Sequence, residues 1–275
     1  MTRVPDQTPL TGFPFLDEAA PPSGVVVAMA HRGGARHPDL LGIENTMTAF
    51  AHAVALGYQY LETDTHVSAD GTLFAFHDDT LDRVAGVPGR FSDLSSSDLR
   101  EVRVAGRFGI PTLSELFEEF PEIRFNIDLK ADGTENHLAE FLHHRNAYQR
   151  VCVGSFSHKR LQRFRKLTGG LVATSASPTE VVAFLGFASL GKAFPSRFRC
   201  FQSLQVPVKH GPIPVVTQQF VRRAHENGVH VHVWTVDDRA EIEHLLGLGV
   251  DGLITDRTDV LKNVLTDKGL WKGTP

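Results

Sequence analysis

The chain has 275 residues, of which 41% are hydrophobic and 22% charged, a composition typical of globular proteins and a length typical of one eight-fold α/β barrel. The formal net charge of -4 at pH 7 provides no global positive field, so we expect no nucleic-acid partner. The longest apolar run, VVAFLGFASL at residues 181–190, is too short to cross a bilayer, so no transmembrane segment is expected.

Residues 1–23 are rich in proline and include the acidic pair Asp17 and Glu18. This stretch lacks the unbroken apolar core of a secretory signal, so we expect a short lead-in, a cytoplasmic protein and one catalytic barrel domain over residues 24–275. The two cysteines, Cys152 and Cys200, lie in stretches with the character of buried strands. Neither has the spacing of a metal or redox site, so both are interpreted as core residues.

From residue 25 onward, short runs of β-branched residues alternate with amphipathic stretches. Eight alternations favour an α/β fold that closes into a single (β/α)8 TIM-type barrel over an open doubly wound sheet. The predicted strands cover residues 25–30, 59–66, 124–129, 151–155, 171–175, 200–206, 230–236 and 252–255. The predicted helices cover residues 46–56, 112–120, 137–147, 158–167, 217–226 and 240–248, and Pro178, Asp237 and Thr258 are expected to open others.

A long insertion interrupts this alternation after the second strand. Residues 77–111 separate that strand, and a short strand predicted at 72–76, from the next helix. Insertions after a barrel strand rise over the carboxyl-terminal face, where barrel enzymes place their active sites. The insertion is therefore expected to form part of a substrate mouth.

Acidic residues alternate along the second predicted strand. Side chains alternate between the two faces of a strand, so Glu62, Asp64 and His66 share one face. Two buried carboxylates side by side are costly without a compensating cation, which favours a hard divalent metal. The alternative is an outward-facing, solvated pair, which is less favoured in a parallel barrel because both faces of the sheet are covered.

The third predicted strand repeats the pattern with Asn126, Asp128 and Lys130 on one face. Asp128 could complete a three-carboxylate metal site with Glu62 and Asp64. A salt bridge between Asp128 and Lys130 at the strand end is the competing interpretation.

Two histidines stand at strand ends instead of on helices. His31 ends the first strand and is followed by Arg32, and His77 follows the short strand of the insertion. These are positions where barrel enzymes carry reactive groups, although a polar glycine loop would also explain the HRGG sequence.

Three further residues are candidates because of where they lie. Glu44 is in the loop after the first strand, so it could reach a metal, and Asn45 could either donate to a ligand oxygen or cap the following helix. Trp234 lies near the carboxyl end of the seventh strand and could line a pocket. His230 and His232, deeper on the same strand, are interpreted as barrel filling.

Together these motifs form an ordered series: HRGG, ENT, ETD, FHDDTLDR, IPTLSEL, NIDLK, VHVWTVDD and DGLITD. The series resembles the glycerophosphodiester phosphodiesterase family over residues 31 to about 259. The resemblance implies a TIM-type barrel that uses Ca²⁺ or Mg²⁺ to hydrolyse a glycerol-bearing phosphodiester into glycerol 3-phosphate and an alcohol. In that family a substrate hydroxyl attacks phosphorus, and water then opens the resulting cyclic intermediate.

The resemblance also implies roles for individual residues. Asp128 stands where relatives usually carry glutamate, and the shorter side chain draws its carboxylate back from a metal. Arg257-Thr258 stands where proline is common in relatives, which bears only on helix entry. The implied roles are a general acid/base pair in His31 and His77, metal ligation by Glu62 and Asp64 with Glu44 close to the ion, and phosphate binding by Arg32 and Lys130.

Several functions remain open on the sequence alone. The expected ligand is a small glycerophosphodiester or a lysolipid, and the oligomeric state is left open. A lysophospholipase D-like or phospholipase D-like activity on longer lipids would be favoured by an apolar mouth. A non-catalytic barrel that binds phosphorylated ligands, and a metal-dependent lyase or isomerase, are the alternatives from other classes.

Overall fold

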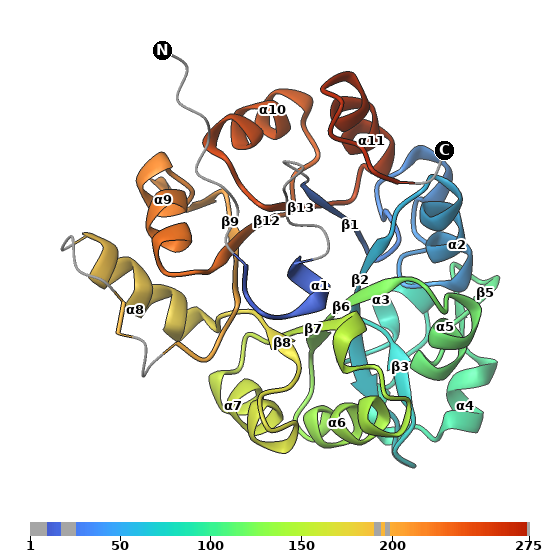
Figure 1. Cartoon of the computed structure of the whole chain (residues 1–275). Helices are drawn as coiled ribbons and strands as arrows, with labels where there is room; N and C mark the ends of the chain where they lie inside the picture. The colour runs from blue at the N-terminus through green and yellow to red at the C-terminus, as the bar shows by residue number, and fades with distance from the viewer. Residues whose placement is uncertain (1–9, 18–25, 190–193, 196–198, 274–275) are drawn as a thin grey trace.

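The computed structural model, which describes residues 10–17, 26–189, 194–195 and 199–273, is built around a ring of parallel strands surrounded by helices (Figure 1). The strands follow the order β8-β7-β6-β2-β1-β13-β12-β9. The TIM-type barrel predicted from the sequence is therefore confirmed. Its strands are β1 (Val27–His31), β2 (Tyr60–Val67), β6 (Arg124–Leu129), β7 (Val151–Gly154), β8 (Ala173–Thr174), β9 (Ser203–Pro207), β12 (His230–Trp234) and β13 (Gly252–Thr255).

The ring closes differently at two places. The first and last strands, β1 and β13, pair in parallel over four residues, from Val27–Gly252 to Ala30–Thr255. Between β8 and β9 the ring is closed by an isolated bridge, Ser175–Ser203, with hydrogen bonds from Ala176 N to Ser203 O (2.8 Å) and from Gln202 N to Thr174 O (2.9 Å). We call this junction the β8–β9 seam.

Helices form the outer layer, and most begin at a polar residue whose side chain accepts a bond from the first turn. Thr112 does so with Glu115 in a reciprocal capping box. None of the helices in the described residues is long and apolar enough to cross a membrane. The helices of this outer layer are α2 (Met47–Ala55), α5 (Leu113–Glu119), α6 (Thr134–His144), α7 (His158–Leu167), α8 (Pro178–Ser189), α9 (Gln218–Glu226), α10 (Arg239–Leu248) and α11 (Thr258–Asp267).

The predicted elements match these bounds to within a few residues, although Val25, the first residue of the first predicted strand, lies outside the described residues. Two details were wrong. Cys200 is exposed and precedes β9 instead of lying in a buried strand. Helix α10 is capped by Asp238, not opened by Asp237, which instead accepts bonds from Thr255 Oγ1 (3.1 Å) and the backbone N–H of Asp256 (2.9 Å).

The insertion after β2 carries small elements with their own hydrophobic cluster. Strand β3 pairs antiparallel with the end of β2, and Phe74, Phe76 and Phe91 pack together in the cluster beneath the loops. Because the cluster is tied to the carboxyl end of β2, the insertion flanks that face of the barrel. Its elements are β3 (Leu73–Ala75), α3 (Asp82–Ala85), a 3₁₀ turn (Phe91–Asp93), α4 (Ser96–Glu101), β4 (Arg103–Val104) and β5 (Phe108–Gly109).

At the amino ends of the strands, a one-turn helix plugs the ring. Helix α1 (Pro14–Asp17) lies inside the circle of strands in Figure 1. Its fully buried Phe15 packs edge-on against Tyr60 with ring centroids 5.2 Å apart, and the Tyr60 hydroxyl donates to Phe15 O at 3.1 Å. Leu16 and Met29 belong to the same apolar cluster.

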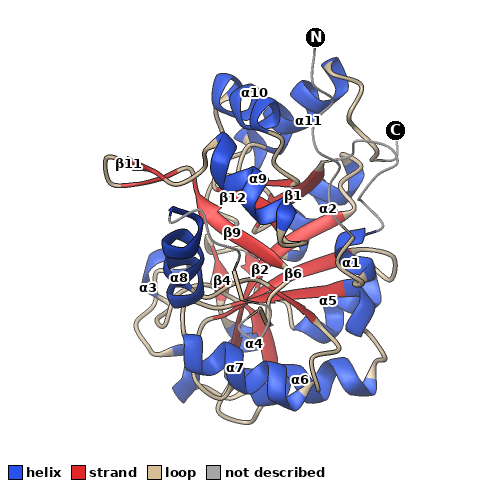
Figure 2. Ribbon diagram, turned by 60° about the vertical axis from the view of Figure 1, so that its left-hand side comes forward, coloured by secondary structure: helices blue, strands red, loops and turns tan. Residues whose placement is uncertain are grey.

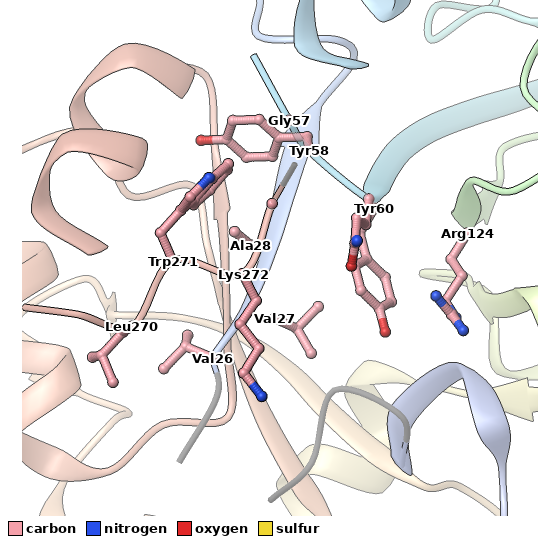
Figure 3. A pocket seen from close by; sticks show the side chains of 12 residues that line it. Val26, Val27, Ala28, Gly57, Tyr58, Tyr60, Arg124, Leu270, Trp271 and Lys272 are labelled. Atoms are coloured by element: carbon pink, nitrogen blue, oxygen red, sulfur yellow. The ribbon is translucent and has the colours of Figure 1, made fainter. Parts of the chain in front are cut away.

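A pocket of about 310 Å³ also opens at this amino end, lined by residues that include Tyr58, Tyr60, Arg124 and Trp271 (Figure 3). The hairpin β10–β11 (Lys209–His210 and Ile213–Pro214) follows the carboxyl end of β9 and projects from the end of the barrel opposite to this pocket (Figure 2). The pocket of Figure 3 and the charged strand ends described below therefore lie at opposite ends of the barrel.

Candidate active site

Charged side chains from neighbouring strands meet at the carboxyl end of the ring. In the register between β2 and β6, Glu62 lies opposite Asn126 and Asp64 opposite Asp128. Asn126 is bonded to Gln205 of β9 (2.8 Å and 3.3 Å), a strand that is not its neighbour in the sheet. This polar face of the strands therefore points into the barrel, as the alternation predicted.

His31, the last residue of β1, is held between two carboxylates. Its Nδ1 lies 2.6 Å from Asp256 Oδ1, and its Nε2 lies 3.7 Å from Glu62 Oε2. Burial opposes the charged imidazole, but Glu62 and Asp256 outweigh it and raise the pKa of His31. Asp256, which follows β13, was not predicted as a partner of His31.

Glu62 is the carboxylate with the least compensation. It is 5% exposed, and besides its contact with His31 its carboxylate accepts a bond from the Arg32 backbone N–H at 3.2 Å. Burial raises the pKa of Glu62 to about 7. A nearby cation would relieve that penalty.

Asp64, only 1% exposed, is surrounded by donors. Arg32 Nε and Lys130 Nζ each lie 2.8 Å from its carboxylate, and Asn45 Nδ2 donates at 3.0 Å. Burial works against ionisation, but Lys130 and Arg32 prevail and lower the pKa of Asp64. Asp64 is therefore an ionised group at the centre of the cluster.

Two residues of this cluster hold left-handed backbone. Arg32 has φ 52° and Asn45 has φ 57°, a region uncommon outside glycine, and the Asn45 N–H donates to Arg32 O at 3.0 Å. The turn aims both side chains at Asp64, and Thr63 Oγ1 fixes Asn45 Oδ1 at 2.9 Å. Asn45 does not cap the following helix, because that role belongs to Thr46.

Lys130 joins the ends of β2 and β6. Besides Asp64, its ammonium contacts Asp128 Oδ2 at 2.6 Å. Burial outweighs this partner and raises the pKa of Asp128. The salt bridge that was the alternative interpretation of Asp128 is thus present.

His77 joins the cluster through a chain of ion pairs in the insertion. Its Nδ1 lies 2.5 Å from Asp78 Oδ1. Arg83 contacts Asp78 at 2.6 Å and Glu44 at 2.7 Å, and Glu44 in turn contacts Arg32 at 2.9 Å. Asp78 and Arg83 were not singled out in the sequence, although both lie in the FHDDTLDR motif.

Aromatic side chains form the other side of the mouth. Trp234 ends β12 and is partly exposed, and its ring packs against Phe156, which follows β7 and is 64% exposed, with centroids 5.9 Å apart. Lys130 Nζ lies 5.8 Å from the centre of the Phe156 ring. Deeper on β12, burial lowers the pKa of His232 to about 3, in keeping with a neutral residue that fills the barrel.

The structure therefore links all ten residues predicted for the site through contacts at one end of the barrel. The four predicted metal ligands, Glu44, Glu62, Asp64 and Asp128, do not form a site made of carboxylates alone. Asp64, Asp128 and Glu44 are each paired with a cationic side chain. Within the described residues, the group whose ligand atoms all lie within 4.8 Å of one another is a different one, formed by His37, Asp39 and His52.

A parallel barrel with imidazoles, carboxylates and fixed cations gathered at the carboxyl ends of its strands has the arrangement of a (β/α)8-barrel enzyme. The sequence profile of the Glycerophosphoryl diester phosphodiesterase family matches residues 31–260. The chain belongs to this family and is an enzyme of its phosphodiesterase class.

Individual proteins and structures similar to this chain are also phosphodiesterases or lysophospholipases by name. The chain is 38% identical over 251 residues to Probable glycerophosphodiester phosphodiesterase 2 of Mycobacterium tuberculosis, covering 90% of this chain and 93% of that protein. It is 27% identical over 271 residues to a human lysophospholipase D, covering 86% and 85%. The fold resembles that of an Oleispira antarctica phosphodiesterase in complex with the product sn-glycerol-3-phosphate, with a TM-score of 0.69, 20% identity and coverage of 88% and 97%.

Proposed function

We propose that this enzyme hydrolyses glycerophosphodiesters to glycerol 3-phosphate and an alcohol, with His31 and His77 as the general acid/base pair. The observation that supports the proposal most strongly is that contacts link the two imidazoles, Arg32 and Lys130 to one cluster of carboxylates that includes Glu62 and Asp64. Imidazole is suited to moving protons near neutral pH, and the two cations supply charge for a phosphodiester.

The polar contacts suggest how each group acts. One histidine takes the proton of the attacking substrate hydroxyl as that oxygen bonds to phosphorus, and the other returns a proton to the alcohol oxygen as its bond to phosphorus breaks. Water then opens the resulting cyclic phosphodiester: it gives a proton to one imidazole as its oxygen bonds to phosphorus, and the ring oxygen takes a proton from the other imidazole as its bond to phosphorus breaks. Asp256 and Asp78 each occupy a ring nitrogen, Nδ1, of one histidine, which orients the opposite nitrogen of each ring. Arg32 and Lys130 lie ready to hold the phosphoryl oxygens as negative charge grows.

We also propose that a divalent cation is held by Glu44, Glu62 and Asp64. Three carboxylates are a hard-oxygen donor set suited to Ca²⁺ or Mg²⁺, and the raised pKa of the buried Glu62 fits a site adapted to a positive charge. Asp128 is engaged by Lys130, so its direct ligation is the weakest part of this set. When bound, such an ion would supply Lewis-acid stabilisation of the phosphoryl oxygens.

The test measures glycerol 3-phosphate release from glycerophosphocholine, glycerophosphoethanolamine and glycerophosphoglycerol. The enzyme is assayed after EDTA treatment and again after Ca²⁺ or Mg²⁺ is added back. We expect activity to disappear with chelation and return with one of the two ions, and kcat/KM to have a bell-shaped pH dependence. Activity indifferent to EDTA would exclude the metal, and no release from any diester would exclude the proposed substrate.

A second candidate is lysophospholipase D activity on longer lipids. Among the described residues, four large apolar side chains are exposed in segments that follow barrel strands: Leu41 (68%), Val87 (42%), Phe156 (64%) and Ile213 (64%). Such a mouth could contact an acyl chain, and the human relative is named for this activity. A kcat/KM higher for lysophosphatidylcholine than for glycerophosphocholine would favour this candidate, and the reverse order would favour the first.

A further inference from the structure

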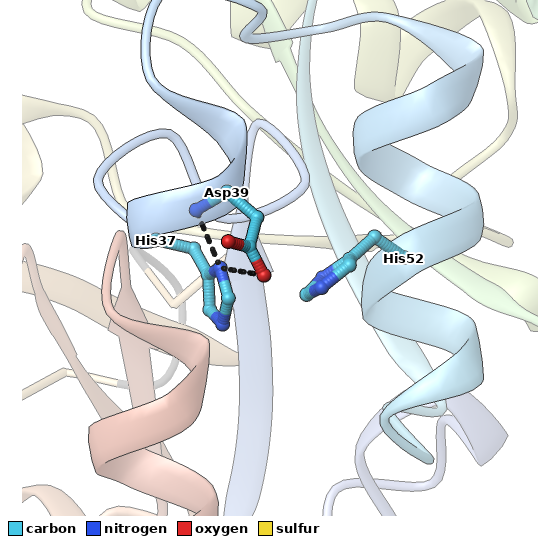
Figure 4. A group of neighbouring side chains, drawn as sticks. All are labelled: His37, Asp39 and His52. Carbon is cyan, nitrogen blue, oxygen red and sulfur yellow. Dashed lines mark hydrogen bonds and ion pairs between the residues drawn. The ribbon is translucent and has the colours of Figure 1, made fainter.

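A cluster of metal-ligating side chains lies outside the candidate active site, on the outer side of the β1–α2 connection. His37 and Asp39 belong to the loop and 3₁₀ turn (Pro38–Leu40) after β1, and His52 belongs to α2. Figure 4 shows the Asp39 carboxylate between the two imidazole rings. One ligand atom from each residue can be chosen so that all three lie within 4.8 Å of one another.

His37 offers its ring in a suitable form. Its Nδ1 accepts a bond from the Asp39 N–H at 3.2 Å and lies 3.9 Å from Asp39 Oδ2. Because Nδ1 accepts in this bond, its lone pair faces the Asp39 side of the ring and the proton of the neutral imidazole is on Nε2. This is the tautomer that a metal ligand at Nδ1 requires, and a metal bound there would take over the lone pair that now accepts the Asp39 N–H.

His52 contributes a second, independent observation. Its Nδ1 is buried and has no hydrogen-bond partner, which is unfavourable for a polar group shut away from water. Its ring centroid lies 4.4 Å from that of His37. Burial and the neighbouring His37 lower the pKa of His52, which favours the neutral form that binds metals.

We propose that His37, Asp39 and His52 form a second metal site that takes Zn²⁺, with water completing the coordination. Two imidazole nitrogens and one carboxylate suit zinc, whereas Ca²⁺ and Mg²⁺ prefer ligand sets made of oxygen. Bonds of about 2.1 Å in a tetrahedral site place ligand atoms roughly 3.4 Å apart, so atoms that now lie within 4.8 Å of one another must approach by at most about 1.4 Å. Asp39, whose side chain is 76% exposed, is free to supply that movement.

The position of the cluster suggests what a bound ion does. An ion bound by the three side chains would tie the loop after β1 to α2. The same loop carries Arg36, whose guanidinium lies 3.4 Å from Asp237 and 3.6 Å from Asp256. Asp256 in turn holds His31. Zinc at this cluster therefore stabilises the loop beside the candidate active site without belonging to it.

The experiment titrates the EDTA-treated, full-length protein with ZnCl₂ by calorimetry, with Mg²⁺ present to compete at the carboxylates. Thermal unfolding is followed in parallel. We expect His52→Gln to weaken this zinc binding by more than about 100-fold, since the loss of an outer-shell partner alone costs 10–100-fold. Zinc should raise the Tm of the wild type but not that of the variant.

Asp39→Asn, a change at an exposed position, is the second variant in case His52→Gln folds poorly, and it should also weaken zinc binding. The matched control is the double variant His143→Gln/His144→Gln, which removes another neighbouring pair of histidine rings, on α6. Equal zinc binding by His52→Gln, Asp39→Asn and wild type would overturn the proposal, as would loss of binding in the control alone. His31→Ala should keep the zinc site, so this result is independent of the proposed catalytic roles.

Discussion

The two ends of the barrel interior differ in chemistry although the same strands build both. At the amino ends, Phe15, Met29 and Tyr60 form an apolar plug. At the carboxyl ends, the same strands β1 and β2 present His31, Glu62 and Asp64, with cations between the acids. One end is thus built for packing and the other for charge, so changes at the two ends should separate stability from activity.

The largest effect is expected at the charged end. His31→Ala and His77→Ala should each lower kcat by about 10²- to 10⁴-fold, the range of general acid/base catalysis, with little change in Tm. Turnover of glycerophosphocholine and thermal unfolding test both parts. His144→Ala, whose side chain is 71% exposed, is the control. A near-normal kcat in either variant would contradict the assignment of that histidine.

At the apolar end the pattern should reverse. Phe15→Ala removes a fully buried ring packed against Tyr60, and we expect a loss of about 3 kcal/mol in unfolding free energy. Its kcat, measured well below the Tm, should stay close to that of the wild type. Denaturant unfolding measures the loss, with Leu10→Ala, at a 73% exposed position, as the control. Equal stability of the two variants would show that the plug does not support the barrel.

A buried carboxylate at the amino end should matter for stability instead of turnover. Asp251, just before β13, accepts from the Val231 N–H at 2.6 Å and lies 2.8 Å from His225 Nε2. Burial opposes its ionisation, but the bond with His225 helps to lower the pKa of Asp251 below its value in the unfolded chain. The ionised group therefore stabilises the fold at pH values above about 4, and this contribution is lost as the pH falls.

Asp251→Asn should cost about 2 kcal/mol at neutral pH and flatten the acid side of the stability profile. Urea unfolding between pH 3 and pH 7 measures both effects. Asp132→Asn, at a side chain that is 92% exposed, should reproduce the wild-type curve. An unchanged acid slope in Asp251→Asn would rule out this carboxylate as the source.

The smallest effect concerns the aromatic side of the mouth. Phe156→Ala should raise KM about two- to fivefold for a choline-bearing diester, because an exposed cation–π contact contributes about 0.5–1 kcal/mol. A glycerophosphodiester with a neutral head group should be unaffected. Leu171→Ala, equally exposed but placed before β8 at the amino end, is the control. Equal changes in KM for both diesters would remove Phe156 from head-group recognition.

The alternation of residue types predicted much of this arrangement. It identified all eight strands and showed that Glu62 and Asp64 share a face, because a period of two is a local property of the chain. The partners of the histidines were missed for two reasons. Asp256 lies 225 residues from His31 and meets it only because the ring closes, and Asp78 and Arg83 depend on side-chain directions within the insertion.

Local alternatives were also decided by tertiary structure. Asn45 had a good sequence rationale as a helix cap, but its left-handed backbone turns the side chain toward Asp64 and leaves the cap to Thr46. The residues around Cys200 predict a strand that includes it, but the strand begins three residues later at Ser203. Such choices between neighbouring residues depend on contacts with distant parts of the chain.

The narrow β8–β9 seam has a consequence for how the molecule opens. Strand β8 has only two residues, and one bridge joins it to β9, whereas β1 and β13 pair over four residues. Amide protons at Ala176 and Gln202 should therefore exchange with deuterium sooner than those of β1, through a partial opening that leaves the rest of the ring paired. Partial opening of the closed ring would then begin preferentially at the β8–β9 seam.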